Sequence, residues 1–261
     1  MIHELRLFFT ALQFFTRVPI PAWVGYEPAW LQDCARHYPL VGACVGAFGA
    51  LVLWLALLVF PPSVAVGLSM AATVWMTGGF HEDGWADSCD ALGGAVSRER
   101  ALQIMKDSRI GAYGAIGLVL MLGLKAATLT ALVQAQPLAA LLCLVWAHAA
   151  SRAAPVWLLH ALAYAGDAEH AKAKPLAMQI GGTGLGVALL WVLSIGALFV
   201  WLEAALLLPL ALASVAALLA TWQMRRWLNQ RLGGFTGDTL GATQQLVELV
   251  CLLALLALLH G

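Results

Sequence analysis

Charged residues are scarce in this chain. They make up 11% of its 261 residues and sum to a net charge of zero, whereas a soluble domain usually carries about 25%. Hydrophobic residues account for 62%, which excludes an ordinary soluble domain and is typical of a polytopic membrane protein. The balanced charge offers no basic surface for a nucleic acid, so we expect no such partner. The five cysteines form no CxxC pair, and neither a zinc site nor a disulfide framework is predicted.

A secretory signal is also missing. Glu4 and Arg6 precede the apolar part of the N-terminal segment, Arg17 ends it, and no small-residue cleavage site follows. This pattern instead predicts a helix lying in the membrane interface, which the pair Pro19 and Pro21 brings to an end.

Several long hydrophobic stretches have the length needed to cross a membrane. They run over 39–60, 63–80, 110–134, 137–162, 184–202, 204–223 and 239–259. We therefore predict an all-α, polytopic integral membrane helical bundle of about seven transmembrane helices with an N-terminal interfacial helix. The short connections predict three hairpins, each between an odd-numbered span and the next. No internal repeat divides the chain, so residues 1–261 are expected to form a single membrane-embedded domain.

Basic residues are distributed unevenly along this pattern. All of them except Lys125 and Arg152 lie in the N-terminal segment or in the polar connections 81–109, 163–183 and 224–238. The positive-inside rule places those segments in the cytoplasm and the C-terminal His260-Gly261 outside.

The most informative segment is GGFHEDGWADSCDALGG, residues 78–94. On a helix, Asp87 lies about 40° from Asp83 and Asp90 about 20° the other way, so the three carboxylates share one face. Two such charges about 6 Å apart repel by about 3 kcal/mol, and a divalent cation would relieve that repulsion. Carboxylate oxygens suit Mg²⁺, so we predict a Mg²⁺ site at Asp83, Asp87 and Asp90, with Glu82 as a further candidate. A solvated loop with capping aspartates is the alternative.

His81 adjoins these carboxylates, and its role stays open between a metal ligand, a phosphate donor and an interfacial histidine. The segment MKDSRIGAYG, residues 105–114, adds Lys106 and Arg109 as candidate phosphate-binding cations. Its alternative is a basic anchor at the membrane surface.

A third cluster, GGFTGDTLGA at residues 233–242, leads into the last span. Gly233, Gly234 and Thr236 before a helix N-terminus predict a contact with an anion, unless Thr236 or Asp238 acts only as an N-cap.

Four polar residues fall within the predicted spans. They are Lys125, His148, Arg152 and Glu248. Groups of this kind are costly in lipid and are functional candidates by default. Arg152 lies near enough to the cytoplasmic end to serve a site there, whereas Lys125 is expected to extend outward to the interface. Glu248 could pair with a basic residue or reach a metal.

Together these segments resemble the cobalamin synthase family of adenosylcobinamide-GDP ribazoletransferases. The matching segments are FFTRVPIP (14–21), HYPLVGACVG (37–46), MTGGFHEDGWADSCDA (76–91), IMKDSRIGAYG (104–114), ASR (150–152) and GGFTGDTLGA (233–242). They follow the family's order over nearly the whole chain. The family usually has an apolar residue in place of Glu82, Gly in place of Ala91 and often Glu in place of Gln245.

The resemblance implies a Mg²⁺-dependent membrane transferase of the bacterial inner membrane, with its active site facing the cytoplasm. Its small-molecule substrates would be adenosylcobinamide-GDP and α-ribazole or α-ribazole 5′-phosphate, and it would release GMP. Asp83, Asp87 or Asp90, or else Asp238, would take the hydroxyl proton. Lys106, Arg109 and Arg152 would neutralise phosphate charge. Oligomeric state is open, a homo-oligomer included.

Two other functions are compatible with acidic residues in a membrane protein. A CDP-alcohol phosphotransferase or a prenyltransferase also uses Mg²⁺ held by paired aspartates, but the DGxxAR continuation is absent after Asp83-Gly84. A cation transporter usually places its carboxylates near the midplane in repeated halves. Here the main cluster lies at a predicted membrane boundary, which disfavours a transporter.

Overall fold

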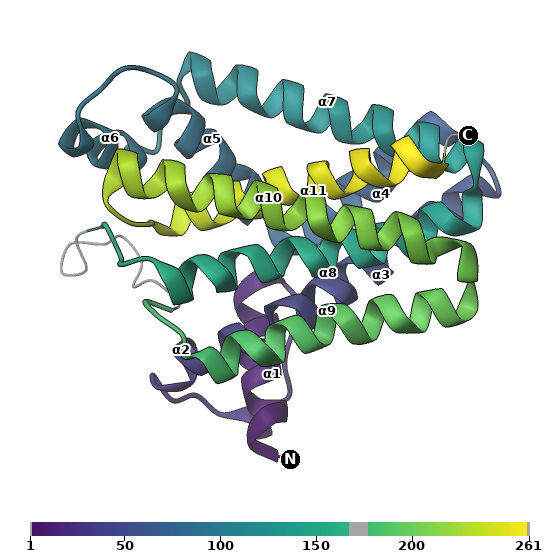
Figure 1. Cartoon of the computed structure of the whole chain (residues 1–261), viewed down its shortest axis with the longest axis horizontal. Helices are drawn as coiled ribbons and strands as arrows, with labels where there is room; N and C mark the ends of the chain where they lie inside the picture. The colour runs from purple at the N-terminus through teal and green to yellow at the C-terminus, as the bar shows by residue number, and fades with distance from the viewer. Residues whose placement is uncertain (1, 167–176, 260–261) are drawn as a thin grey trace.

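The computed structural model describes residues 2–166 and 177–259, which fold into a bundle of long helices (Figure 1). In chain order the helices are α1 (Ile2–Phe15), η1 (Ala22–Val24), α2 (Trp30–Asp33), η2 (Cys34–His37), α3 (Tyr38–Leu57), α4 (Pro62–Thr77), α5 (Phe80–Leu92), α6 (Arg98–Met105), α7 (Ala112–Ala135), α8 (Pro137–Ala161), α9 (Gly182–Leu202), η3 (Ala204–Leu206), α10 (Leu207–Leu232) and α11 (Gly237–Leu259). The all-α prediction is confirmed. The middle of the predicted connection 163–183 and the terminal His260-Gly261 lie outside the described residues.

Within residues 2–166 and 177–259, six helices are long and apolar enough to cross a membrane, and the bent pair α4–α5 raises the number to seven if it counts as one span. The outer surface agrees, since α9 exposes Leu190, Leu193 and Trp201 by 61%, 69% and 79%. Apolar side chains on an outward face are stable in lipid. The chain is therefore a multi-pass membrane protein.

α8 lies at the centre of the bundle, where it packs against α3, α9, α10 and α11. The contact with α3 is the most extensive between any two described helices, and it depends on Gly42 and Gly46. An added Cβ at Gly46 would come within 2.8 Å of the Val145 Cα, so only glycine lets the two backbones approach this closely. This small-xxx-small pair fixes the position of α8.

α1 crosses the direction of the bundle helices rather than joining them (Figure 1). It buries Leu7, Ala11 and Phe15 and exposes Ile2 and Leu5. The orientation and the exposed apolar face agree with the predicted interfacial helix.

The polar connections hold more helix than the sequence indicated. Residues 81–109 were predicted to be a polar connection with a helical acidic face at Asp83, Asp87 and Asp90; they contain most of α5, which agrees, and all of α6, which was not predicted. The predicted sixth span ended at residue 223, whereas α10 continues to Leu232. Helix termini project beyond the lipid, where charged side chains stay hydrated, so hydropathy marks the end of the membrane rather than of the helix.

One predicted hairpin is also wrong. α9 and α10 follow each other through η3, yet α9 packs mainly against α8 and α3, and α10 against α8 and α11. α8 thus stands between consecutive spans in the middle of the bundle (Figure 1).

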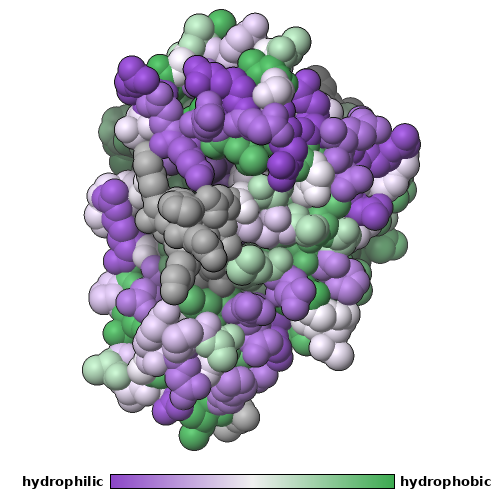
Figure 2. All heavy atoms as spheres, turned by 90° about the vertical axis from the view of Figure 1, so that its left-hand side faces the viewer, coloured by the Kyte–Doolittle hydropathy of each residue, from purple (hydrophilic) through white to green (hydrophobic). Residues whose placement is uncertain are grey.

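The polar clusters gather at one end of the bundle. That end, on the left of Figure 1, carries α5, α6, the last turns of α10 and the start of α11. Figure 2 looks directly onto it and shows hydrophilic side chains gathered above all over its upper part. The separation of polar and apolar surface predicted from the sequence is therefore present in the fold.

Candidate active site

α5 carries the acidic segment because two consecutive glycines end α4 and redirect the chain. Gly78 and Gly79 both adopt left-handed backbone conformations, with φ of 69° and 71°. Residues other than glycine rarely tolerate such angles, so this pair forms a sharp turn. α5 starts at Phe80, bent by 89° from α4, and so lies across the end of the bundle.

A cavity of about 480 Å³ opens beside α5. Asp83 and Asp87 line it from α5, and Asp238 lines it from the first turn of α11. Lys106 and Arg152 also line it, although they are distant in sequence. Three of the predicted carboxylates and two of the predicted cations therefore meet in one volume.

The same cavity has an aromatic and apolar wall. Its aromatic members are Phe14, Phe15, Tyr38, Phe80, Tyr164 and Phe235. His81 is buried at this wall, where its ring stacks on Phe15 with centroids 5.3 Å apart. A ligand bound here would meet both charged groups and aromatic rings.

Asp238 reaches the cavity because α5 and α11 pack closely. An added Cβ at Gly84 would lie 2.7 Å from the carbonyl oxygen of Asp238, and one at Gly241 would lie 3.4 Å from the His81 Cα. Both glycines remove side chains from the contact. The acidic face of α5 and the N-terminus of α11 thus form one site.

Asp90 has different neighbours, although it shares the α5 face. One of its carboxylate oxygens accepts a hydrogen bond from Gly111 N at 2.7 Å, and the other accepts one from Gly114 N at 2.8 Å. These amides belong to the N-terminal turn of α7, where an anion is favoured by otherwise unpaired N–H groups. Asp90 therefore stabilises the start of α7, and a metal-binding role for it stays a prediction.

Arg109 and Glu82 do not line this cavity. The Arg109 side chain is 86% exposed and pairs with Asp107 at 2.6 Å; this hydrogen bond raises the pKa of Arg109. Glu82 accepts a hydrogen bond from Gln245 Nε2 at 3.0 Å, and it lines both a small pocket inside the bundle and a second hollow that it shares with Asp83 and Asp87. Phosphate binding by Arg109 and metal binding by Glu82 stay predictions.

The glycine-rich segment before α11 forms a turn. Gly233 ends α10 in the left-handed conformation, with φ 69°, while Gly234 lies against Ala163. Thr236 precedes α11 and exchanges two hydrogen bonds with Thr239. Thr236 N donates to Thr239 Oγ1 at 2.8 Å, and Thr239 N donates to Thr236 Oγ1 at 3.3 Å. Thr236 lines the cavity, whereas Gly233 and Gly234 shape the turn that leads to it.

Among the described residues, no group of three or more His, Cys, Asp or Glu side chains could hold a metal ion. Asp83, Asp87 and Asp238 nevertheless line one volume. Mg²⁺ commonly takes one or two carboxylates and completes its coordination with water and phosphate oxygens. These residues therefore fit a cation that is shared with a phosphate-bearing ligand.

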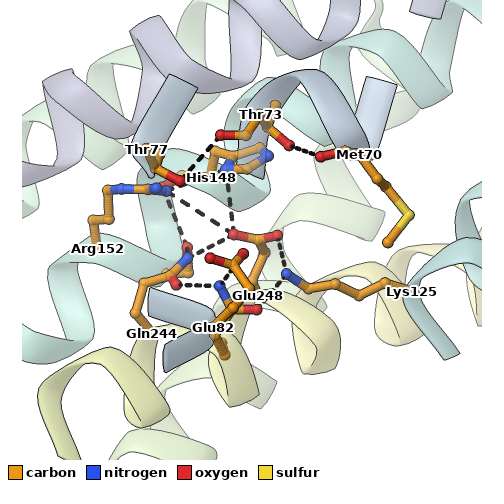
Figure 3. A network of polar contacts seen from close by, with 11 residues as sticks. Met70, Thr73, Thr77, Glu82, Lys125, His148, Arg152, Gln244 and Glu248 are labelled. Atoms are coloured by element: carbon orange, nitrogen blue, oxygen red, sulfur yellow. Dashed lines mark hydrogen bonds and ion pairs between the residues drawn. The ribbon is translucent and has the colours of Figure 1, made fainter. Parts of the chain in front are cut away.

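Beneath the cavity lies a buried ionic network between α7, α8 and α11 (Figure 3). The Lys125 Nζ lies 2.6 Å from Glu248 Oε1 and donates to Gln245 Oε1 at 2.7 Å. Glu248 Oε2 lies 3.2 Å from His148 Nδ1. The expectation that Lys125 extends to the interface was wrong, because its side chain is only 6% exposed and has a buried anion within reach.

Amide side chains complete this network, and sequence reasoning missed them. Gln244 Nε2 donates to Glu248 Oε2 at 2.6 Å and to Ser151 Oγ at 3.0 Å, and Gln245 links Lys125 to Glu82. Two adjacent glutamines in an apolar span were the available signal, since buried amides require partners.

The model of the cobalamin-5-phosphate synthase family matches residues 7–256. A protein named adenosylcobinamide-GDP ribazoletransferase from Leptothrix cholodnii is 63% identical over 257 residues, covering 98% of this chain and 97% of that protein. Proteins of the same name from Shewanella piezotolerans and Vibrio cholerae are 45% and 40% identical, covering 97% and 99% of this chain and 95% and 96% of their own lengths. No solved structure matches the chain significantly.

Proposed function

The chain belongs to the cobalamin-5-phosphate synthase family, and from this premise we propose that it is an adenosylcobinamide-GDP ribazoletransferase. It joins adenosylcobinamide-GDP to α-ribazole, or to α-ribazole 5′-phosphate, and releases GMP. The product is adenosylcobalamin or its 5′-phosphate, so the reaction is a late step of cobalamin synthesis.

The observation that carries this proposal is the cavity of about 480 Å³. It collects Asp83, Asp87 and Asp238 together with Lys106, Arg152 and several aromatic side chains. A pyrophosphate needs cations, a hydroxyl nucleophile needs a proton acceptor, and aromatic bases pack on rings. The cavity supplies all three from segments that are far apart in the sequence.

The reaction is a displacement at phosphorus. The ribose 3′-hydroxyl oxygen of α-ribazole forms a bond to the phosphorus that remains on cobinamide, and the bond from that phosphorus to the GMP oxygen breaks. The hydroxyl proton passes to a carboxylate among Asp83, Asp87 and Asp238. Phosphoryl transfer depends mainly on positioning and neutralisation of charge, so Lys106 and Arg152 stabilise the negative charge on the departing GMP.

Mg²⁺ is the cofactor that this donor set fits, with Asp83 and Asp87 as protein ligands and Asp238 close by. When bound, it would supply further charge neutralisation at the pyrophosphate. The residues of the chain then orient the two substrates and limit access of water, which would otherwise compete as a nucleophile.

The polar end of the bundle faces the cytoplasm in this proposal, and the membrane is the bacterial inner membrane. The basic residues support the orientation, since Arg98, Arg100 and Arg231 all lie at the end that carries the cavity. Nucleotide substrates are present on that side.

GMP release by the purified full chain in detergent or liposomes tests the function. With adenosylcobinamide-GDP, α-ribazole and Mg²⁺ present, we expect one GMP for each corrinoid product, and none when α-ribazole is omitted or EDTA is added. Release that is independent of α-ribazole would indicate a hydrolase. No release from a folded preparation would refute the proposal. Lipid-linked CDP-alcohols tested in parallel would then identify the related class of transferase.

A further inference from the structure

Glu248 is a carboxylate enclosed in the apolar part of the bundle, with a side chain only 5% exposed. An isolated charge there is costly, and a buried ion pair is often no more stable than well-packed apolar residues. Stability alone therefore gives a weak reason for placing Glu248 and Lys125 in this position. Their neighbours indicate another.

Arg152 connects this network to the cavity. Its Nη1 donates to the His148 backbone oxygen at 2.9 Å and lies 3.1 Å from His148 Nδ1 and 4.0 Å from Glu248 Oε2. Its Nε is buried without a hydrogen-bond partner among the described residues. The side chain is 3% exposed and also lines the cavity that contains Asp83 and Asp238. Nη1 of the guanidinium is thus held by the bundle, while Nε has no hydrogen-bond partner among the described residues.

The backbone around Arg152 is equally constrained. An added Cβ at Gly42 would collide with the His148 carbonyl oxygen and lie 2.8 Å from Arg152 Cδ. α3 therefore closes over the long stem of Arg152 and limits the positions that its guanidinium can take. The remaining freedom is at the charged head, where His148 and Glu248 make their contacts.

We propose that Glu248 and His148 are positioning residues that hold Nη1 of Arg152 from the membrane side, so that the guanidinium presents its free donor edge to a substrate phosphate. This inference rests on the proposed function, because it requires a phosphate in the cavity. Lys125 pairs with Oε1 of Glu248, which leaves Oε2 directed at His148 and Arg152 (Figure 3). None of the three residues takes part in bond making.

Orientation is the benefit of such an arrangement. Arginine binds phosphate best when its planar group is held in one plane, because less motion is then lost on binding. A guanidinium held by Glu248 and His148 would contribute most when charge develops on the departing GMP. Disturbing it should affect the GDP-bearing substrate and leave binding of α-ribazole unchanged.

A double-mutant cycle tests this coupling with purified full-length protein. The paired change Lys125→Met and Glu248→Gln removes the Lys125–Glu248 ion pair as a unit, so Lys125 is not left without its anion, while Arg152 keeps its hydrogen bond to the His148 backbone oxygen. We expect kcat/KM for adenosylcobinamide-GDP to fall about 10- to 100-fold, with KM for α-ribazole unchanged. In an Arg152→Ala background, the same paired change should alter the remaining activity by less than about twofold.

The control is Glu203→Gln, an acid between α9 and η3 whose carboxylate accepts a hydrogen bond from the Ala205 amide; it should leave the kinetics unchanged. If the paired variant does not accumulate, Glu248→Asp takes its place, since it keeps the charge but withdraws it by one methylene. An equal loss of activity in both backgrounds, or wild-type kinetics in the folded variant, would overturn the inference alone. Absence of GMP release from the wild type would instead refute the proposed function.

Discussion

Lys106 and Arg109 are three residues apart, and both are cations beside the acidic helix. Lys106 lines the cavity, whereas the Arg109 side chain is exposed and forms an ion pair with Asp107. Lys106 and Arg109 thus have different environments although they carry the same charge and lie close together in the sequence. Contact with the cavity decides which of them can bind a substrate phosphate.

Lys106→Ala should raise KM for adenosylcobinamide-GDP about tenfold or more, because a charge-assisted hydrogen bond contributes about 1.5–3 kcal/mol. Arg109→Ala is the matched control and should change KM less than about twofold, as exposed ion pairs contribute little. Initial rates of GMP release at varied substrate concentration measure both values. Equal effects of the two substitutions would contradict this assignment.

The individual site residues were predictable to different degrees. Helical periodicity predicts that Asp83 and Asp87 share one face of a helix, and in the structure both line the cavity. The partners of Asp90 did not follow, because Gly111 and Gly114 lie more than 20 positions along the chain. Lys125 was misplaced for the same reason: its partner Glu248 is on another helix, and periodicity carries no information about such a pairing.

At the scale of the elements, α5 and α11 build the site by contact through Gly84 and Gly241. The sequence indicated the two ends of this contact, since both segments carry glycine beside aspartate. It did not reveal that the glycines face each other. That information resides in the packing of two helices that are 150 residues apart, which neither hydropathy nor capping patterns encode.

Gly84→Ala should therefore separate α5 from α11 and lower the rate of GMP release at least tenfold, since the added methyl group meets backbone rather than a flexible side chain. Overpacking of this kind costs about 1–3 kcal/mol, so thermal unfolding in detergent should begin at a lower temperature. Gly67→Ala, on a face of α4 with nothing within 4 Å, is the control and should leave both unchanged or raise stability slightly. Full activity in Gly84→Ala would show that the close approach of the two helices is dispensable.

At the scale of the whole molecule, the bundle separates an apolar belt from one polar end that carries the cavity (Figures 1 and 2). Hydropathy predicted this division and the number of spans, because both depend on composition averaged over some 20 residues. Neighbour relations were harder: α8, not α10, is the main partner of α9. Connections constrain which helices follow each other, whereas packing decides which of them touch.

Cysteine labelling tests the proposed orientation of the whole bundle. Gln103→Cys lies on exposed α6 at the polar end, and Gln134→Cys lies exposed at the opposite end of α7. A membrane-impermeant maleimide should label Gln103→Cys only in inverted inner-membrane vesicles and Gln134→Cys only in intact spheroplasts. The wild type is the blank for the native cysteines, which are buried or half-buried. The reverse pattern would place the cavity outside the cytoplasm.

The most direct test of the central claim, that the acidic face of α5 is the site of transfer, is GMP release by Asp83→Asn. Asp83 is exposed to the cavity, so replacement by the isosteric amide should leave the unfolding temperature unchanged. Asp33→Asn, which alters an exposed carboxylate paired with Arg36, is the control. The account predicts a loss of at least about 100-fold for Asp83→Asn, as for removal of a group that stabilises charge in the transition state, and a normal rate for Asp33→Asn. Wild-type release by a folded Asp83→Asn protein would contradict it.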